Sequence, residues 1–220
     1  MDSSVIFDVD GVLLDLTGPE EDAFFLAFER RYGITGLSRD WDSYKVRNDE
    51  HIIAEILACH NLPQEDAELI VKDYVSILFR FITDGSIHPQ TITGAGELIR
   101  SLSNDHLIGI ATANLLSAAQ IRLASQNLWN PVSHLAFGAE GSGHKRETVA
   151  RAIAATGLAK QRIIYIGDNL NDVDAGLSNG VNFIGFSTEP ARLEKLKSAG
   201  AKHLSSDHVT TGDLIGQLLK

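Results

Sequence analysis

The chain has 220 residues, of which 44% are hydrophobic and 22% charged, a balance that is typical of a soluble globular protein and excludes a disordered or fibrous one. Its 29 acidic side chains against 19 basic ones give a formal net charge of −10, which argues against nucleic acid or an anionic membrane surface as a partner. Cys59 is the only cysteine, so a disulfide framework and every multi-cysteine metal site are excluded. We expect Cys59 to be buried in a helix, in a protein of a reducing compartment.

The N-terminal residues and the length of the apolar runs bear on the expected cellular location. Met1 to Ser4 run directly into an apolar strand, without the basic stretch and cleavage pattern of a signal peptide. No apolar run approaches the length that a membrane span requires. We therefore expect a cytoplasmic, soluble protein. An anionic ligand would have to be bound locally, by a cation or by a few placed basic side chains.

The predicted elements fall into two groups along the chain. After a first strand at 5–7, the stretch from about 17 to 88 shows only helical patterns, such as the spacing of Ile52 and Ile56. Thr17-Gly18-Pro19-Glu20 has the spacing of a capping box and predicts the start of the first of these helices. Further strands are predicted at 107–111, 134–137, 163–166 and 182–185, alternating with helices at 96–102, 115–126, 147–156, 172–178, 190–199 and 212–219.

This alternation of strands and helices predicts the fold class. It is typical of βαβ units around a parallel sheet, whereas the purely helical stretch interrupts it after the first strand. We expect an α/β protein with a Rossmann-like, doubly wound parallel sheet and an inserted all-helical domain. The expected boundaries are 1–15 and 89–220 for the α/β core and 16–88 for the helical domain.

Carboxylates follow two of the predicted strands. Asp8 and Asp10 come at the end of the first strand and point the same way if it stays extended, and Asp168 and Asp172 follow the strand at 163–166. Ligands of open parallel sheets bind outside the carboxyl ends of the strands, where these groups fall. Clustered carboxylates need a cation, and hard oxygen ligands suit Mg²⁺. A favourable charge at a helix N-terminus is the alternative explanation for Asp172.

Two further segments fall at the same sheet edge. Thr112-Ala113-Asn114 follows the strand at 107–111 and offers a hydroxyl and backbone N–H groups to an anion, although a helix N-cap is the other interpretation of Thr112 or Asn114. Lys145 and Arg146 lie near a predicted helix start, where the helix dipole disfavours cations. A nearby acidic cluster would remove that conflict.

Together these segments resemble the haloacid dehalogenase-like hydrolases over nearly the whole chain. Asp8-Val9-Asp10-Gly11-Val12 looks like the first motif of that family, Thr112 the second, Lys145 the third, and Gly167-Asp168-Asn169-Leu170-Asn171-Asp172 the fourth. The helical domain is similar to the family's type-one cap. Relatives commonly have proline after the third-motif lysine, whereas Arg146 stands there in this chain, so Arg146 is the alternative third-motif cation.

The resemblance implies a Mg²⁺-dependent hydrolase of phosphomonoesters that acts on a small phosphorylated metabolite. Asp8 would attack phosphorus to give an aspartyl-phosphate, and Asp10 would act as general acid and then general base. Asp8, the backbone carbonyl of Asp10 and Asp168 would hold Mg²⁺, with Asp172 as a further ligand or an outer partner.

The remaining roles that the resemblance implies concern phosphate and leaving group. Thr112, the backbone N–H of Ala113 and Lys145 would hold the phosphoryl oxygens. The segment around Lys45 and Arg47 resembles the loop that contacts substrate in this family, so either side chain would meet a polar or anionic group; a solvated charge cluster is the alternative. A sugar phosphomutase, similar to β-phosphoglucomutase, and a non-enzymatic phosphoacceptor module are the competing functions. The sequence leaves the substrate and the oligomeric state open.

Overall fold

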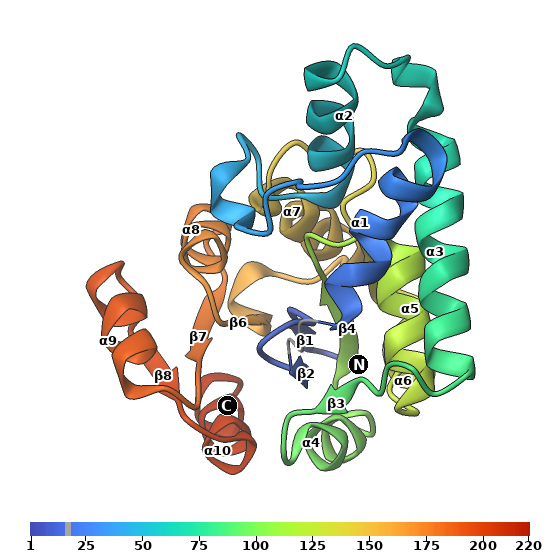
Figure 1. Ribbon diagram of the computed structural model, residues 1–220. Coiled ribbons are helices and arrows are strands. Elements are labelled where there is room, and N and C mark those ends of the chain that lie inside the picture. The colour runs from blue at the N-terminus through green and yellow to red at the C-terminus, as the bar shows by residue number, and fades with distance from the viewer. Residues whose placement is uncertain (16–18) are drawn as a thin grey trace.

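The computed structural model describes residues 1–15 and 19–220, and only the backbone of Pro19 and Glu20. Six parallel strands form one sheet in the order β5-β4-β1-β6-β7-β8 (Figure 1). The chain runs from β1 outward to β4 and β5, then returns to the other side of β1 for β6, β7 and β8, so the sheet is doubly wound as predicted. The strands are β1 (Ser4–Phe7), β4 (Leu107–Ala111), β5 (Ala136–Phe137), β6 (Ile163–Gly167), β7 (Asn182–Phe186) and β8 (His203–Ser205).

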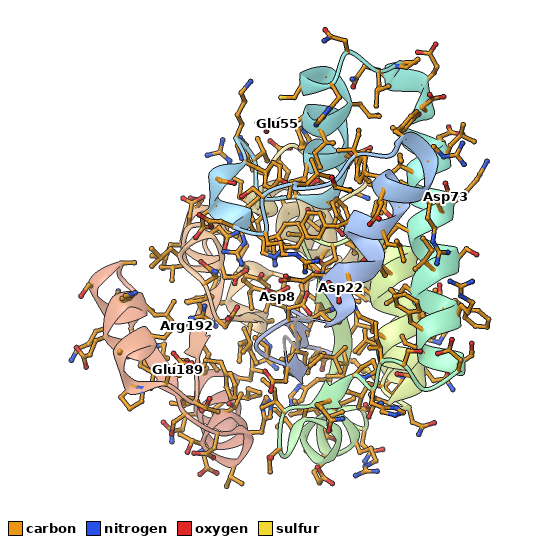
Figure 2. All side chains as sticks on the ribbon, in the orientation of Figure 1. Asp8, Asp22, Glu55, Asp73, Glu189 and Arg192 are labelled. Atoms are coloured by element: carbon orange, nitrogen blue, oxygen red, sulfur yellow. The ribbon has the colours of Figure 1, made fainter. Side chains whose placement is uncertain are left out.

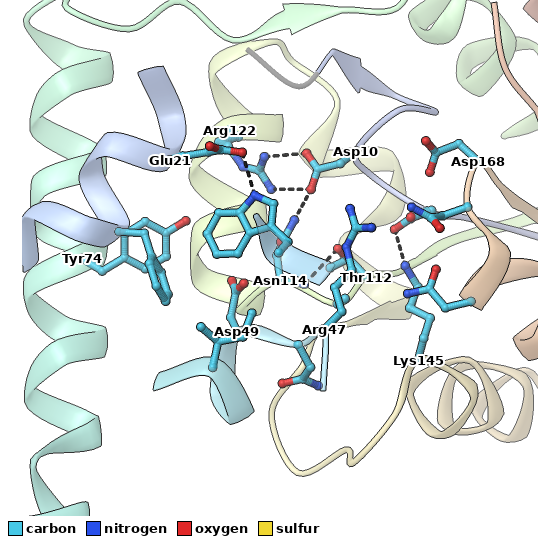
Figure 3. A pocket seen from close by; sticks show the side chains of 18 of the residues that line it. Asp10, Glu21, Arg47, Asp49, Tyr74, Thr112, Asn114, Arg122, Lys145 and Asp168 are labelled. Carbon is cyan, nitrogen blue, oxygen red and sulfur yellow. Dashed lines mark hydrogen bonds and ion pairs between the residues drawn. The ribbon is translucent and has the colours of Figure 1, made fainter. Parts of the chain in front are cut away.

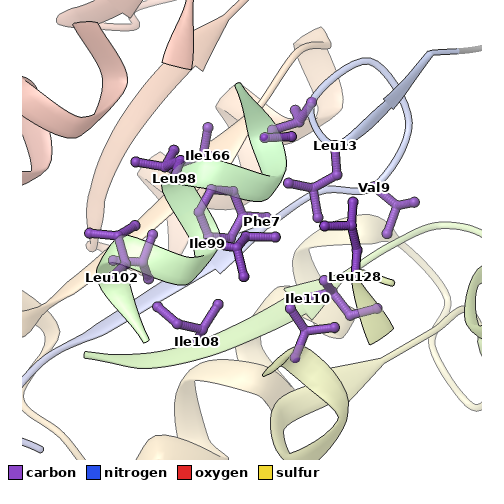
Figure 4. Packing of buried hydrophobic residues seen from close by; sticks show 14 of the residues in the cluster. Phe7, Val9, Leu13, Leu98, Ile99, Leu102, Ile108, Ile110, Leu128 and Ile166 are labelled. Atoms are coloured by element: carbon purple, nitrogen blue, oxygen red, sulfur yellow. The ribbon is translucent and has the colours of Figure 1, made fainter. Parts of the chain in front are cut away.

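Helices cover both faces of the sheet, because the strands carry apolar side chains on both faces. Val5 and Phe7 belong to one buried cluster, whereas Ile6 between them belongs to the opposite one. Figure 4 shows the first cluster, in which Phe7 and Ile166 pack near Leu98 of α4. The first face is covered by α4 (Ala95–Leu102), α5 (Leu116–Ser125), α6 (Trp129–Val132) and α10 (His208–Leu218), and the second by α7 (Lys145–Thr156), α8 (Leu170–Asn179) and α9 (Pro190–Ser198).

The segment between the first strand and β4 is helical in its described part, as predicted. We call residues 19–83 the helical insert; it contains α1 (Pro19–Tyr32), α2 (Asp49–Cys59), α3 (Ala67–Thr83) and two single 3₁₀ turns. It has its own buried apolar cluster, which includes Phe24, Phe28 and Leu57 and extends onto Leu115 and Ala118 of the sheet domain. None of the helices in residues 1–15 and 19–220 is long and apolar enough to cross a membrane.

Two details of the insert bear on the sequence predictions. Thr17, the predicted cap of the first helix, lies outside the described residues, and α1 begins at Pro19. The predicted burial of Cys59 is wrong, because Cys59 is the last residue of α2 and its side chain is exposed. The buried apolar residues of α2 end at Leu57, two residues before Cys59.

The insert leaves and rejoins the sheet domain at one place. The two-residue strands β2 (Leu14–Asp15) and β3 (Gln90–Thr91), which the sequence analysis missed, pair antiparallel. The predicted boundaries near Asp15 and His88 therefore lie beside each other in space.

The other differences from the predicted elements have local causes. The strand predicted at 134–137 is shortened to β5 by a 3₁₀ turn at Ser133–Leu135. This turn passes so close to β4 that a Cβ atom on Gly109 would lie 2.4 Å from the Leu135 carbonyl oxygen. The strand β8 was not predicted, and α10 begins at His208 because the Asp207 side chain accepts a hydrogen bond from the Thr210 N–H.

Candidate active site

A cavity of about 120 Å³ lies between the carboxyl ends of the central strands and the helical insert (Figure 3). Figure 2 places Asp8 near the centre of the molecule, with Arg192 on the side of α9. The sheet side of the cavity carries most of the side chains that the sequence analysis singled out: Asp8, Asp10, Thr112, Ala113, Lys145 and Asp168.

Asp8 ends β1 and is buried beside a lysine. Its backbone N–H donates to the Ile166 carbonyl at 2.8 Å, and its Oδ1 accepts from the Val9 N–H at 2.8 Å. Lys145 Nζ lies 2.7 Å from the same Oδ1. Burial raises the pKa of Asp8, the attraction of Lys145 opposes this, and the repulsion of Asp172 and Asp168 adds to the rise.

Lys145 is the first residue of α7, so it lies at the helix end that disfavours a cation. Its Nζ contacts Asp172 Oδ1 at 3.1 Å as well as Asp8, and these carboxylates supply the acidic cluster that the sequence analysis required. Burial alone would lower the pKa of Lys145, but the two carboxylates outweigh it and raise the pKa. Arg146 is exposed, which favours Lys145 over its alternative as the cation of this site.

Asp168 follows β6, and one of its carboxylate oxygens lies within 4.8 Å of an oxygen of Asp8. Burial and the repulsion of Asp172 raise the pKa of Asp168 to about 7, although Arg192 Nη1, 2.6 Å from Asp168 Oδ2, acts in the opposite direction. The turn after Asp10 requires glycine here, because Gly11 has a φ of +75° and a Cβ atom would lie 2.2 Å from Asp168 Oδ2.

Asp172 lies behind the cavity, with 0% of its surface exposed. Its Oδ1 accepts a hydrogen bond from the Tyr165 hydroxyl at 2.6 Å, and its Oδ2 accepts from the N–H groups of Asp168 and Asn169 at 3.2 and 3.0 Å. Asn169 in turn caps α8 in a capping box with Asp172. Both oxygens already have donors, so Asp172 is placed to orient the loop and Lys145 rather than to contact a ligand.

The carboxylates fit a divalent cation. One oxygen of each of Asp8, Asp168 and Asp172 lies within 4.8 Å of the others, and all three side chains are buried. Their repulsion and burial would be relieved by Mg²⁺, which prefers carboxylate and carbonyl oxygens. Because the Asp172 oxygens are occupied by donors, Asp8 and Asp168 are the side chains best placed to contact the ion.

Asp10 is held by an arginine that the sequence analysis missed. Arg122 Nη1 lies 2.6 Å from Asp10 Oδ1, Nη2 donates to Oδ2 at 3.3 Å, and Asn114 Nδ2 also donates to Oδ2. Arg122 comes from α5 and is buried. Its signal in the sequence is a charged residue next to Leu123, on the helix face that carries Ala118 and Ala119.

The residues after β4 line the cavity between Asp10 and Lys145. Thr112 is buried, and its Oγ1 accepts from the Asn114 N–H at 3.2 Å. The capping interpretation of Thr112 and Asn114 is wrong, because Leu115 occupies the N-cap of α5 without a side-chain hydrogen bond. Thr112 and Ala113 therefore lie where the sequence analysis expected an anion to be held.

The N-terminus of α2 is docked on the loops of the sheet domain. Asn48 Nδ2 donates to the Ser142 carbonyl at 3.1 Å, and Asp49 Oδ2 accepts from the Leu115 N–H at 2.9 Å. The Glu50 carboxylate accepts from the Gly141 N–H at 3.0 Å. The insert thus closes one side of the cavity.

The two basic residues predicted to contact substrate occupy different places. Arg47 lines the cavity, and its Nη1 pairs with Asp42 Oδ1 at 3.0 Å. Lys45 lines a neighbouring hollow together with Arg47, His144 and Arg146.

Residues 5–186 match the family model of the haloacid dehalogenase-like hydrolases. The chain belongs to this family. The resemblance inferred from the motifs is thereby confirmed. No curated protein matches the sequence.

Solved structures share the fold of this family member. It is similar to CbbY from Rhodobacter sphaeroides in complex with phosphate, with a TM-score of 0.76 and 17% identity over 94% of this chain and 95% of that one. A hydrolase from Pseudomonas syringae gives a TM-score of 0.71 at 19% identity, covering 99% of this chain and 100% of that one. A putative β-phosphoglucomutase from Bacteroides vulgatus gives a TM-score of 0.71 at 19% identity, covering 99% of this chain and 90% of that one.

Proposed function

We propose that the protein is a Mg²⁺-dependent phosphomonoester hydrolase that acts on a small phosphorylated metabolite through an aspartyl-phosphate. The observation that carries the proposal is Asp8, a buried carboxylate at the end of β1 with Lys145 at 2.7 Å and Asp168 close by. An apolar strand has no structural need to end in a buried acid with its own cation. Membership of a hydrolase family supports the same reaction class.

The residues would divide the reaction as follows. An Asp8 oxygen attacks phosphorus as the ester P–O bond breaks, and Asp10 gives its proton to the leaving oxygen. Water then attacks the aspartyl-phosphate and gives a proton to Asp10, which releases phosphate and the Asp8 carboxylate. Thr112, the Ala113 N–H and Lys145 bind the phosphoryl oxygens throughout.

Asp8, Asp168 and the backbone carbonyl of Asp10 would hold Mg²⁺, which would supply positive charge beside the phosphoryl group as the two anions approach. Asp172 keeps the loop after β6 and Lys145 in place.

The helical insert would act as a cap. Residues 16–88 form the proposed cap domain and 1–15 with 89–220 the catalytic domain. Docking of Asn48, Asp49 and Glu50 on the sheet domain supports a closed arrangement that excludes bulk water. Arg47, which lines the cavity, is the better placed of the two proposed polar contacts of the cap; Lys45 lies at the neighbouring hollow.

The test is turnover of a generic aryl phosphate and of a panel of phosphorylated metabolites. We expect phosphate release that requires Mg²⁺, stops with EDTA, and falls by at least about a thousandfold in Asp8→Asn, because the nucleophile is lost. Asp105→Asn, an exposed aspartate at the opposite sheet edge, is the matched control and should keep activity. Formation of a phosphate isomer without stoichiometric phosphate release would indicate a mutase instead. Absence of any turnover would contradict both enzymatic functions.

A further inference from the structure

The insert side of the cavity has a chemistry different from the sheet side. Phe24, Trp41 and Tyr74 line it together with the carboxyl groups of Glu21 and Asp49. We call these five residues the aromatic chamber. We propose that the aromatic chamber binds a positively charged ammonium group of the leaving alcohol, so that the substrates are phosphate esters of small amino alcohols. This inference rests on the proposed phosphatase function and names its substrate class.

The rings of the chamber form walls rather than one flat stack. The Phe24 ring meets Tyr74 at 5.3 Å and Trp41 at 5.6 Å, in both cases at an interplanar angle of 77°. Phe25 stacks on Trp41 at 5.3 Å and holds the indole in place. Aromatic rings set at angles around a cavity attract cations, including quaternary ammonium groups, through their negative faces.

The carboxyl groups add negative charge beside the rings. Glu21 Oε1 accepts the indole N–H of Trp41 at 2.7 Å, and Figure 3 shows Glu21 and Asp49 at the cavity with Tyr74. Among the described lining residues, Arg47 is the one basic side chain that the insert contributes, and Asp42 pairs with it at 3.0 Å. Burial raises the pKa of Asp49 to about 7, although the hydrogen bond from the Leu115 N–H and the attraction of Arg122 act in the opposite direction.

On the sheet side of the cavity, by comparison, acidic and basic side chains are paired. Lys145 pairs with Asp8, Arg122 with Asp10 and Arg192 with Asp168, each at 2.6 to 2.7 Å. Among the described residues, neither Glu21 nor Asp49 forms an ion pair, so an anionic leaving group would be repelled by these carboxyl groups and a cationic one attracted to them. This argues against a second anion inside the cavity.

Position and size narrow the class further. Asp10, the proposed donor of a proton to the leaving oxygen, lines the same cavity as the chamber, so the leaving alcohol extends toward the insert. The insert bounds the cavity on the side opposite the sheet, which favours a short alcohol beside the phosphoryl group. Lys45 and Arg146, the basic residues that line only the neighbouring hollow, would attract the phosphate on entry.

The decisive comparison uses substrates that differ in one charge. With Mg²⁺ present, we expect kcat/KM for phosphocholine or phosphoethanolamine to exceed that for 3,3-dimethylbutyl phosphate, the neutral analogue of phosphocholine, by about tenfold. Phosphoglycolate, which carries a carboxylate, should be the poorest of the set. Equal rates for charged and neutral esters, or a preference for phosphoglycolate, would overturn the inference and leave the phosphatase function intact.

Variants locate the effect in the chamber. Glu21→Gln and Trp41→Leu should bring the charged-to-neutral ratio of kcat/KM near one while the neutral ester is still hydrolysed. Trp129→Leu, which changes the other tryptophan in the apolar cluster of the sheet domain, should leave the ratio unchanged. A ratio that survives in both chamber variants would contradict the assignment of these residues.

A binding measurement keeps the inference testable if no ester is hydrolysed. In Trp129→Phe the remaining tryptophan is Trp41, and its fluorescence should change saturably with tetramethylammonium or choline but not with 3,3-dimethylbutanol. No saturable change with either cation would overturn the chamber proposal, whatever the fate of the proposed reaction.

Discussion

Three of the carboxylates at the sheet edge each pair with a cation from a different helix. Lys145 of α7 meets Asp8, Arg122 of α5 meets Asp10, and Arg192 of α9 meets Asp168. Removing one partner of a buried pair leaves an uncompensated charge, which costs more than the pair contributes. The three cations therefore control which carboxylates are available to a ligand.

Arg122→Met should impair Asp10 without affecting substrate binding. Its guanidinium fixes both Asp10 oxygens, so we expect kcat to fall by roughly ten- to a hundredfold with KM within about twofold, as for loss of an oriented acid–base group. Arg122→Lys keeps the positive charge but cannot contact both Asp10 oxygens in the same way, so its kcat should lie between those of the wild type and Arg122→Met. Steady-state kinetics on one ester decide the point, with exposed Arg100→Met as the unaffected control. A rise in KM alone would contradict the positioning role.

Arg192→Met should strengthen Mg²⁺ binding. Arg192 competes with a metal for Asp168, but its side chain is 41% exposed, so we expect the Mg²⁺ dissociation constant to fall only by roughly three- to tenfold. Lys195→Met, on the exposed part of the same helix, gives the same change in net charge and is the matched control. Titration calorimetry measures both; equal affinities in the two variants would show that Arg192 does not compete.

The acids of the site were predictable, whereas two of their cations were not. Asp8 and Asp168 end apolar strands, and parallel strands bring their carboxyl ends to one edge. Arg122 lies 112 residues from Asp10 in sequence, so its contact depends on how α5 packs against the sheet. Arg192 reaches Asp168 from the helix after the next strand, which no local pattern indicates.

At the scale of elements, α2 couples the insert to the sheet domain through its first turn. Asn48 caps the helix by accepting from the Glu50 N–H, and its amide also donates to the Ser142 carbonyl. Asp49, the next residue, binds the first turn of α5 through the Leu115 N–H. The helix cap and the contact between the two parts are thus made by the same residues.

Asp49→Asn should stabilise the protein at neutral and alkaline pH. Burial raises the pKa of Asp49 from 3.8 to about 7, opposed by the Leu115 N–H and Arg122 and reinforced by Asp10 and Glu140. Between these pH values the folded state holds a proton that the unfolded chain releases, so this contribution to stability is lost as pH rises and the penalty is complete above about pH 7.

Asparagine has no charge to bury. Relative to the wild type, the free energy of unfolding of Asp49→Asn should increase from pH 4 to pH 8, by an amount on the order of a few kcal/mol. Urea denaturation at both pH values measures it, with Glu68→Gln on the exposed side of α3 as the control. If the free energies of unfolding of Asp49→Asn and the wild type differ by the same amount at both pH values, the raised pKa of Asp49 is contradicted.

Element predictions succeeded where periodicity is long and failed where pairing is short. The helices of the insert and the strands β4, β6 and β7 follow from apolar patterns. β2 and β3 have two residues each, too few for a pattern, and exist only because their partners meet in space. α7 and α8 begin earlier than predicted, at Lys145 and Leu170, because their first residues lie outside the buried apolar pattern on which the prediction rests.

At the scale of the whole molecule, α5 joins the two apolar clusters. Leu115 and Ala118, at its start, belong to the cluster of the helical insert, while Ala119 and Leu123 belong to a cluster under the sheet. α3 packs on α5 from the insert side, as Figure 1 shows. The insert therefore shares its core with the sheet domain.

Because the helical insert and the sheet domain share an apolar core, we expect one cooperative unfolding transition. The chain has two tryptophans, Trp41 in the insert and Trp129 in the sheet domain, so Trp129→Phe and Trp41→Phe give a reporter for each part. We expect the two fluorescence curves in urea, each compared with far-UV circular dichroism of the same variant, to have coincident midpoints. Leu115→Ala, which weakens the shared cluster, should separate them. Separate midpoints in the single-tryptophan variants would contradict the shared core.

The pairing of Leu14 with Thr91 and of Asp15 with Gln90 has an evolutionary consequence. Because the chain departs and returns on neighbouring strands, an entire helical module can be exchanged or lengthened without rethreading the sheet. Selectivity for the leaving group and reactivity toward phosphorus can then diversify separately within one gene. Any such replacement must still cover Leu115 and Ala118, so these two apolar residues mark where a helical module has to dock.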